Sequence, residues 1–373
     1  MSDVKKRIVM CVDLDYFYAQ AEEVRNPALK GKPLVVCVFS GRTEDSGAVS
    51  TSNYHARTLG VRSGIPIVQA KNILSSHPEA VFLPMDRDYY DLTSERVMNI
   101  LRSHSSSFEQ ASIDEAYLDI SLETNGDYAK ALQIGEKIKR EISVDEQLTC
   151  TIGIGPNKLI SKMAVDAKKP DGLNVIRLNE IRSYLDPLPI GKLFGIGPKM
   201  EKKLQALNIA TVAQLAAADL DLLSQNFGEK LGPQLKSNAL GIDDDPINER
   251  EVEQFSRIVT LKENAVSYDF QDVLAPLVKD LGMKLVSANL ICESIGIIAI
   301  TSQLKTKTRS RKIEPPTDSE HVILEVVSDL FRAFFAEEKL ELHGISIRRV
   351  GIRVSNFAKK LSEGKEKNLT DFF

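Results

Sequence analysis

Acidic side chains at the ends of two apolar segments carry the strongest chemical signal in the sequence. Asp13 closes the apolar run 8–12, and Asp114 and Glu115 interrupt the segment 112–120. If these segments are neighbouring strands, the three carboxylates converge at one edge of a sheet, at a cost of roughly several kcal/mol unless cations neutralise them. Hard oxygen donors favour Mg²⁺, and two such ions can activate a hydroxyl nucleophile and stabilise a leaving pyrophosphate. The alternative is that each acid is a separately solvated strand-end charge.

Two further segments carry groups suited to phosphate oxygens. Tyr54 and Arg57 lie three positions apart, so they share one face of a short helix predicted over 53–59. A phenol and a guanidinium on one face can bind a phosphate together. Lys169 stands beside Pro170 in a predicted turn and is suited to a triphosphate. The alternatives are an ordinary surface helix and a solvated loop.

A glycine pair indicates a third kind of phosphate contact. Gly195 and Gly197 are followed by Pro198, Lys199 and apolar residues at helical spacing, a pattern typical of a helix-hairpin-helix. Such a turn exposes backbone N–H groups at a helix N-terminus and binds nucleic-acid phosphates without reading the sequence. The alternative is a glycine that simply ends a helix.

Basic residues alternate along the segment 304–312. They are Lys305, Lys307, Arg309 and Arg311, with no acid between them. A strand would place all four on one face. That face would carry a positive stripe suited to a duplex backbone. A solvated edge strand protected by its charges is the alternative.

The elements that must position these groups follow from the apolar patterning. In the first half we predict strands over 7–13, 34–39, 113–120 and 149–154, and helices over 16–24, 88–104, 128–142 and 158–167. Asp15 is available as the N-cap of the first helix. This order predicts a ferredoxin-like split βαβ sheet, interrupted by a polar insert at 40–66.

The second half changes character twice. Residues 179–241 are predicted to form an all-helical unit, and the acidic, apolar-poor stretch 243–253 reads as a linker. Beyond it we predict another α+β unit, with strands over 256–261, 295–301, 304–312 and 345–354 and helices over 272–288 and 321–337. The predicted fold class is therefore α+β with several domains.

Composition limits the class of protein. A chain of 373 residues with 43% hydrophobic and 27% charged residues is expected to form two to four globular domains. The net charge of −4 excludes a global positive field. The four cysteines (Cys11, Cys37, Cys150 and Cys292) are far apart, which argues against a zinc or disulfide framework and for buried, reduced thiols. Because no apolar run approaches a membrane span of about 18 residues, we expect a cytoplasmic protein with no membrane partner. We also expect a monomer.

Four motifs together resemble those of Y-family DNA polymerases, most closely the archaeal lesion-bypass enzymes. They are VDLDYFYAQ at 12–20, YHAR at 54–57, SIDEAYLD at 112–119 and GIG at 195–197, in matching order and spacing over essentially the whole chain. The resemblance implies a palm at 1–16 and 84–176, fingers at 17–83, a helix-hairpin-helix thumb at 177–242, a linker at 243–254, a little finger at 255–357 and a tail at 358–373.

The resemblance also implies a role for individual residues. It makes Asp13, Asp114 and Glu115, with the backbone carbonyl of Leu14, the ligands of two Mg²⁺ ions, and it makes Tyr18 a steric gate against ribonucleotides. The triphosphate contacts are Tyr54, Arg57, Lys169 and Thr51. The residues over the template and the nascent base pair are Val38, Gly47, Ala48, Val49, Ser50 and Gly64. The DNA contacts are Gly195, Gly197, Lys199 and the alternating basic residues.

The implied activity is low-fidelity, template-directed addition of dNTPs to a primer, with lesion bypass. Small residues over the nascent pair leave room for a damaged base but weaken the check on pair shape. The last residues resemble a sliding-clamp-binding peptide, with Leu369, Phe372 and Phe373 as its hydrophobic plug; a tail folded onto its own core is the alternative. The acidic linker and Glu366 depart from the family pattern. Rival functions are a nucleotide cyclase, which also uses paired carboxylates, and a clamp-bound scaffold that coats DNA.

Overall fold

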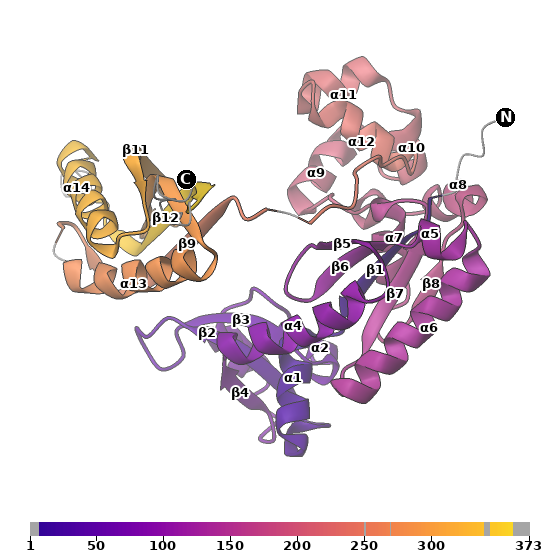
Figure 1. Ribbon diagram of the computed structural model, residues 1–373, viewed down its shortest axis with the longest axis horizontal. Coiled ribbons are helices and arrows are strands. Elements are labelled where there is room, and N and C mark those ends of the chain that lie inside the picture. Colours follow the sequence, from indigo (N-terminus) through magenta and orange to yellow (C-terminus); the bar gives the residue numbers. More distant parts are fainter. Residues whose placement is uncertain (1–6, 250, 269, 339–343, 361–373) are drawn as a thin grey trace, which may run out of the picture. The chain divides into compact units, whose positions relative to one another are not determined.

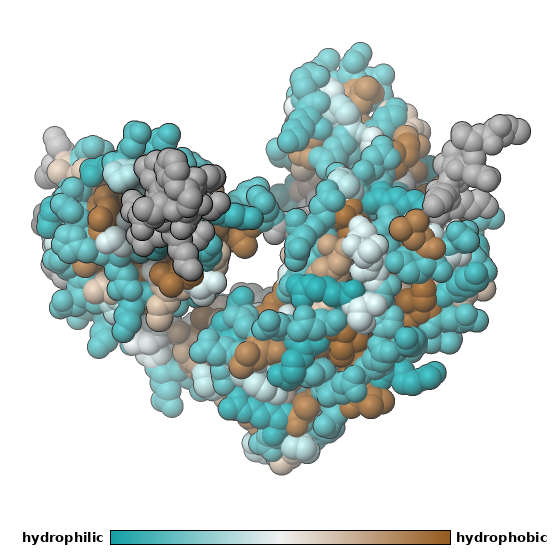
Figure 2. All heavy atoms as spheres, in the orientation of Figure 1, coloured by the Kyte–Doolittle hydropathy of each residue, from teal (hydrophilic) through white to brown (hydrophobic). Residues whose placement is uncertain are grey.

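The computed structural model describes residues 7–249, 251–268, 270–338 and 344–360 (Figure 1). The chain divides into two compact units, one made of residues 1–38 and 48–250 and the other of residues 39–47 and 251–373. On the faces seen in Figure 2, hydrophilic residues cover most of the surface and hydrophobic ones form small separate groups. Among the helices in the described ranges, none is long and apolar enough to cross a bilayer.

A five-stranded sheet forms the centre of the first unit. Its order is β5 (Ser107–Gln110), β6 (Glu115–Asp119), β1 (Val9–Leu14), β7 (Cys150–Gly155) and β8 (Leu173–Val175). β1 is antiparallel to both β6 and β7, and all six of its residues are buried. This central strand therefore has a core on each of its two faces.

Helices cover both faces of this sheet. Met10, Val12 and Leu14 belong to a core that includes residues of α4 (Arg87–Arg102) and α6 (Tyr128–Asp145). Val9 and Cys11 point the other way and pack with Val165 of α7 (Lys158–Asp166). Strand alternation thus assigns odd-numbered β1 residues to the α7 face.

A smaller sheet follows the first helix. α1 (Phe17–Arg25) and the 3₁₀ turn Pro27–Leu29 lead to β2 (Leu34–Phe39), which lies between β3 (Gly47–Ser52) and β4 (Val81–Pro84), with α2 (Tyr54–Thr58) and α3 (Ile67–Ile73) beside them. The strand predicted over 34–39 is present, but it belongs to this sheet and not to the central one. No strand is predicted over 47–52 because Gly, Ser and Thr conceal its alternation; the structure forms β3 there.

The predicted cap of the first helix is wrong. α1 begins after Tyr16, whose backbone is left-handed (φ 37°). The carboxylate of Asp15 is instead engaged with β7 and with the loop before β8. Asp15 is therefore part of the sheet's edge and not a helix cap.

The helical segment of the first unit has its own core. The short α5 (Ser121–Thr124) lies between β6 and α6 and is not part of it. The helical segment contains α8 (Ile181–Leu185), α9 (Pro198–Ala206), α10 (Val212–Ala217), α11 (Leu220–Phe227) and α12 (Leu231–Ala239), with 3₁₀ turns at Leu178–Glu180 and Ile190–Lys192. Its apolar residues pack against Leu159 and Ile160 of α7. Residues 243–249 form neither helix nor strand, but Asp243 accepts a hydrogen bond from the backbone of Leu159 (2.9 Å) and Ile247 is buried.

The second unit is an antiparallel sheet with helices on one face. The strand order is β11 (Thr306–Thr317), β10 (Leu290–Thr301), β12 (Ile347–Lys359) and β9 (Gln254–Ala265). α13 (Gln271–Ser287) and α14 (Glu320–Glu338) share one apolar core with Ile295, Ile297 and Ile352 of the sheet. The predicted α+β class, with an all-helical segment and a second α+β unit, is confirmed.

Candidate active site

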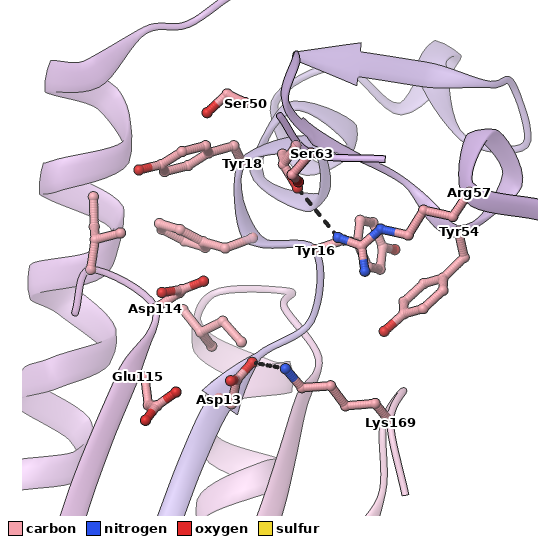
Figure 3. A pocket seen from close by; sticks show the side chains of 14 residues that line it. Asp13, Tyr16, Tyr18, Ser50, Tyr54, Arg57, Ser63, Asp114, Glu115 and Lys169 are labelled. Carbon is pink, nitrogen blue, oxygen red and sulfur yellow. Dashed lines mark hydrogen bonds and ion pairs between the residues drawn. The ribbon is translucent and has the colours of Figure 1, made fainter. Parts of the chain in front are cut away.

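A pocket of about 280 Å³ opens beside the C-terminal end of β1 and the N-terminal end of β6 (Figure 3). It gathers residues from segments far apart in the sequence. Its lining consists of Asp13, Leu14, Tyr16, Phe17, Tyr18, Ser50, Thr51, Tyr54, Arg57, Ser63, Ile113, Asp114, Glu115 and Lys169. All three predicted carboxylates, the predicted gate and all four predicted triphosphate residues therefore line one cavity.

Strand register explains why the acids meet. Asp13 pairs directly with Glu115 across β1 and β6, so the two side chains lie on the same face, the one that α7 covers. Asp114 immediately precedes β6, and its carbonyl accepts a hydrogen bond from the backbone N–H of Leu14 (2.8 Å). The hydroxyl of Ser112 donates to the Asp114 carboxylate (2.5 Å). The separately solvated alternative does not describe this arrangement.

Lys162 is a residue of this site that the sequence did not reveal. Its ammonium lies 2.7 Å from the Asp13 carboxylate and also bonds Glu115, bridging the two acids from α7. Burial lowers the pKa of Lys162, but the attraction of Asp13 and Glu115 outweighs it and raises the pKa well above its ordinary value. Lys169 approaches the other oxygen of Asp13 (2.6 Å). The available signal is a lone lysine within the apolar face of α7.

Two glycines let α7 approach the sheet closely enough for this contact. A Cβ placed on Gly153 of β7 would lie 2.0 Å from the backbone oxygen of Ser161, and one on Gly155 would lie 2.8 Å from Ile160. Both are distances at which the helix would have to move. Because Gly153 and Gly155 have no side chain, α7 can lie close to β7, and the Lys162 ammonium can reach the two acids.

The acidic residues fit a hard divalent cation in kind. All of the candidate ligands are oxygens, which Mg²⁺ prefers. In the described part of the chain, no three His, Cys, Asp or Glu side chains converge on one point as they stand. Instead the ammonium groups of Lys162 and Lys169 lie against Asp13. The protein thus supplies its own positive charge at a place that is chemically suited to a metal ion.

Tyr18 is held as a fixed wall of the pocket. Its ring stacks on Tyr90 with centroids 4.5 Å apart and planes 17° apart. Tyr90 is fully buried, and its hydroxyl donates to Glu22 (2.8 Å). Burial raises the pKa of Tyr18 above its ordinary value.

Tyr54 and Arg57 come from α2, which Asn53 caps by accepting a hydrogen bond from the Ala56 N–H (3.0 Å). The Arg57 guanidinium lies 5.1 Å from the Tyr54 ring centroid, and its Nε donates to the carbonyl of Ser52 (2.9 Å). A second guanidinium nitrogen lies 3.4 Å from the Thr51 hydroxyl. The helix predicted over 53–59 thus presents both side chains to the pocket, as Figure 3 shows.

Some predicted residues lie elsewhere. Of those expected over the nascent base pair, Ser50 lines the pocket, whereas Val38, Gly47, Ala48, Val49 and Gly64 are outside its described lining. Gly195 has a left-handed backbone (φ 88°), and Gly197 is the N-cap of α9, with Lys199 in the first turn. Leu369, Phe372 and Phe373 fall outside the described residues.

The alternating basic residues have an unexpected environment. Lys307, Arg309 and Arg311 share one face, as predicted, but they pair with Ala299, Ile297 and Ile295, whose side chains form the helix-covered core. Lys305 precedes the strand. Each of the three bonds an acid of α14: Lys307 and Arg309 bond Glu338, and Arg311 bonds Asp329 (3.4 Å). The hydrogen bond from Lys307 lowers the pKa of Glu338. The basic face predicted from the sequence is therefore present for these three residues, with acids of α14 beside it.

The opposite face of the same sheet has another set of polar groups. Arg353 of β12 pairs with Gly296 of β10, whose neighbour in β11 is Ser310. Gly351 pairs with Ile298, which is next to Thr308. Arg353 and the hydroxyl groups of Ser310 and Thr308 therefore lie on this face, and atoms of the neighbouring strands pack closely against Gly296 and Gly351.

Comparisons with known proteins agree over the whole chain. The impB/mucB/samB family model matches residues 12–166, its C-terminal domain matches 252–369, and the model described as "DNA polymerase-iota, thumb domain" matches 191–243. DNA polymerase IV of Methanosarcina acetivorans is 45% identical over 95% of this chain and 97% of its own length. The enzyme of that name from Saccharolobus solfataricus is 41% identical, over 96% and 99%.

Solved structures give the same result. A chimera of the Y-family DNA polymerases Dbh and Dpo4 superposes with a TM-score of 0.85 and 36% identity, covering 94% of this chain and 98% of that one. A structure titled as the insertion ternary complex of Dbh DNA polymerase has a TM-score of 0.70 at the same identity and coverage. The similarity therefore extends from sequence to fold.

Proposed function

The chain belongs to the Y family of DNA polymerases and is a DNA-directed DNA polymerase, and on that premise we propose that it performs low-fidelity translesion synthesis by two-metal nucleotidyl transfer. The observation that carries the proposal is that three carboxylates line one pocket together with Tyr54, Arg57 and Lys169. Acids on one side and phosphate-binding groups on the other suit a nucleoside triphosphate whose α-phosphate lies between them.

Asp13, Asp114, Glu115 and the carbonyl of Leu14 would hold two Mg²⁺ ions. When bound, such a pair makes the primer 3′-hydroxyl more nucleophilic and stabilises the negative charge of the departing pyrophosphate. The protein itself contributes position and charge and no covalent nucleophile. Lys162 of α7 would keep Asp13 and Glu115 together from outside the pocket lining.

The triphosphate would lie against Tyr54, Arg57, Thr51 and Lys169. Arg57 is already oriented by its bond to Ser52, so less side-chain freedom is lost when a phosphate binds. Tyr18 would lie under the sugar, where a 2′-hydroxyl meets its ring. The stack on Tyr90 prevents the ring from yielding.

Primer–template DNA is the proposed second substrate, since the relatives include ternary complexes of a DNA polymerase. In the first unit, the turn at Gly195 and Gly197 would contact phosphates through backbone N–H groups. In the second unit, we assign the DNA contact to the sheet face with Arg353, because the basic residues of the other face already bond acids of α14. Small residues at 47–50 would leave the nascent base pair loosely enclosed, which favours lesion bypass over fidelity.

Primer extension tests the proposal. In Mg²⁺, wild-type protein should extend a primer on an undamaged template and past an abasic site. Asp114→Ala should reduce extension on the order of a thousandfold while DNA affinity is retained. Asp145→Ala, which alters an exposed acid at the end of α6, is the matched control and should extend normally. Extension by Asp114→Ala at the wild-type rate would remove the carboxylate assignment.

A tethering role is proposed for the tail, whose Leu369, Phe372 and Phe373 would bind a sliding clamp. Deleting residues 369–373 should leave basal extension unchanged but abolish stimulation by the clamp, since tethering acts through effective concentration. The measurement is primer extension with and without clamp for both proteins. Persistent stimulation of the truncated protein would contradict the assignment.

A further inference from the structure

Asp15 is a buried carboxylate beside the active site that neither the metal nor the nucleotide assignments use. Its side chain is fully buried, one residue beyond the end of β1. A buried carboxylate is costly unless donors satisfy it. Three donors do so: the hydroxyl of Thr151 bonds one oxygen (2.8 Å), and the hydroxyl of Thr149 (2.8 Å) and the backbone N–H of Asp171 (2.9 Å) bond the other.

The backbone of Asp15 is fixed as well. Its N–H donates to the carbonyl of Thr149 (3.1 Å), and its carbonyl accepts from the side chain of Gln20 (2.6 Å). Gln20 in turn accepts from the N–H of Thr149, which closes the arrangement between α1 and β7. The carboxylate therefore projects from a rigid support, toward the loop that joins α7 to β8.

That loop carries Lys169. The residue bonded by Asp15 is Asp171, two positions after Lys169, and its backbone is left-handed (φ 53°). Lys139 bonds the Asp171 side chain (2.6 Å) and the carbonyl of Cys150 (2.6 Å). A Cβ on Gly172 would lie 2.3 Å from the carbonyl oxygen of Lys168, so the loop is tightly folded. The loop is thus held at Asp171, while the Lys169 side chain reaches the pocket and Asp13.

We propose that Asp15 is a positioning residue, which fixes the loop 168–172 on β7 and so sets Lys169 at the place where the triphosphate of the incoming nucleotide binds. The inference rests on the proposed triphosphate contact of Lys169. Asp15 touches neither substrate nor metal in this role. In the structure all three of its partners donate to its carboxylate oxygens.

Asp15→Asn is the sharpest substitution. It keeps the shape but removes the charge and replaces one acceptor oxygen with an NH₂ group, so one of the three hydrogen bonds donated to the carboxylate is lost; at best the NH₂ donates to a threonine hydroxyl in its place. Losing one hydrogen bond to a buried charge should weaken dNTP binding about tenfold. The maximum insertion rate and the affinity for primer–template should change far less, because Lys169 still reaches the pocket once nucleotide is saturating.

The experiment is single-nucleotide insertion of dATP opposite template T by the full chain, measured by rapid quench to separate the dATP dissociation constant from the maximum rate. Thr151→Val should raise the dissociation constant in the same way, and Thr151→Ser should restore it. Thr124→Val removes a buried threonine hydroxyl that bonds Ile120 (2.6 Å) away from the pocket, and it should change nothing.

A double-mutant cycle tests whether Asp15 acts through Lys169. Lys169→Met should weaken dATP binding, and adding Asp15→Asn should weaken it little further. If the two effects instead multiply, or if Asp15→Asn alone leaves the dissociation constant unchanged while Lys169→Met raises it, the inference is wrong but the triphosphate contact stands. If Lys169→Met has no effect, both are wrong. Should Asp15→Asn fail to fold, the Thr151 pair decides by the same criteria.

Discussion

Two regions of the molecule pair acids with bases, and they differ in burial. In the pocket, Lys162 bridges Asp13 and Glu115, with side chains only 8–16% exposed. In the second unit, Lys307 and Arg309 bond Glu338, whose side chain is 16% exposed like that of Glu115, but the basic side chains are 34% and 41% exposed. Removing one partner of a buried pair leaves an uncompensated charge and costs about 3–5 kcal/mol, whereas an exposed pair is worth about 0–1 kcal/mol. We therefore expect loss of the base to cost more stability at Asp13 and Glu115 than at Glu338.

Lys162→Met should have the largest effect. Without the ammonium, Asp13 and Glu115 repel each other, so the metal-free protein should lose about 3–5 kcal/mol of stability. Mg²⁺ should restore part of the loss, because it supplies the missing charge between the two acids. The measurement is the thermal midpoint of unfolding with and without Mg²⁺.

Lys158→Met is the matched control, because Lys158 pairs with the buried Glu109 outside the Mg²⁺ candidates. It should destabilise the protein without a gain from Mg²⁺. If Mg²⁺ raised the thermal midpoint equally in wild type and both variants, Mg²⁺ would not replace the charge of Lys162 between the two acids.

Tyr18→Ala removes bulk from the same pocket without removing charge. The preference for dNTP over rNTP should fall on the order of tenfold or more, since a 2′-hydroxyl no longer meets the ring. Competing insertion of dATP and ATP measures it. Tyr128→Ala, at the start of α6, is the control and should keep the preference. Unchanged selection in Tyr18→Ala would exclude Tyr18 as the gate.

In the second unit we expect a smaller effect, on the salt dependence of DNA affinity, and only for a substitution on the sheet face away from α13 and α14. Arg353→Gln should reduce the slope of log Kd for primer–template against log salt by about 1, the effect of one lost phosphate contact. Arg309→Gln should leave the slope unchanged, because Arg309 already bonds Glu338. The reverse result would return the DNA contact to the face of the alternating basic residues.

The sequence predicted the site well where regular periodicity controls position. Alternation in β1 and β6 puts Asp13 and Glu115 on one face, and helical spacing puts Tyr54 and Arg57 on another. Most strands and helices with clear apolar patterns were also predictable. β3 was not, because its small polar residues form a strand through pairing with β2 and not through their own pattern.

Contacts across distant segments escaped prediction. Alternation shows that Lys307 and Arg309 share a face, but only the register with Ile297 and Ala299 shows that helices cover it. Lys162 and Asp15 are single polar residues with distant partners: Asp13 and Glu115 lie 149 and 47 positions from Lys162, and the donors to the Asp15 carboxylate lie 134–156 positions away. Their roles depend on how α7 and β7 pack, which no local pattern encodes.

Because of Gly153 and Gly155, one part of the site depends on backbone packing, whereas other residues of the pocket can be changed by substitution. Since α7 lies directly on β7, any side chain at Gly153 would move the helix and carry Lys162 away from the acids. The position of Lys162 relative to Asp13 and Glu115 therefore depends on the packing of the α7 backbone on β7, and substitution of Gly153 cannot change it in small steps. Tyr18 and the β3 residues Ser50 and Thr51, which also line the pocket, can be replaced one at a time, and we expect substrate preference to vary there. Engineering of this enzyme should therefore begin on that side of the pocket.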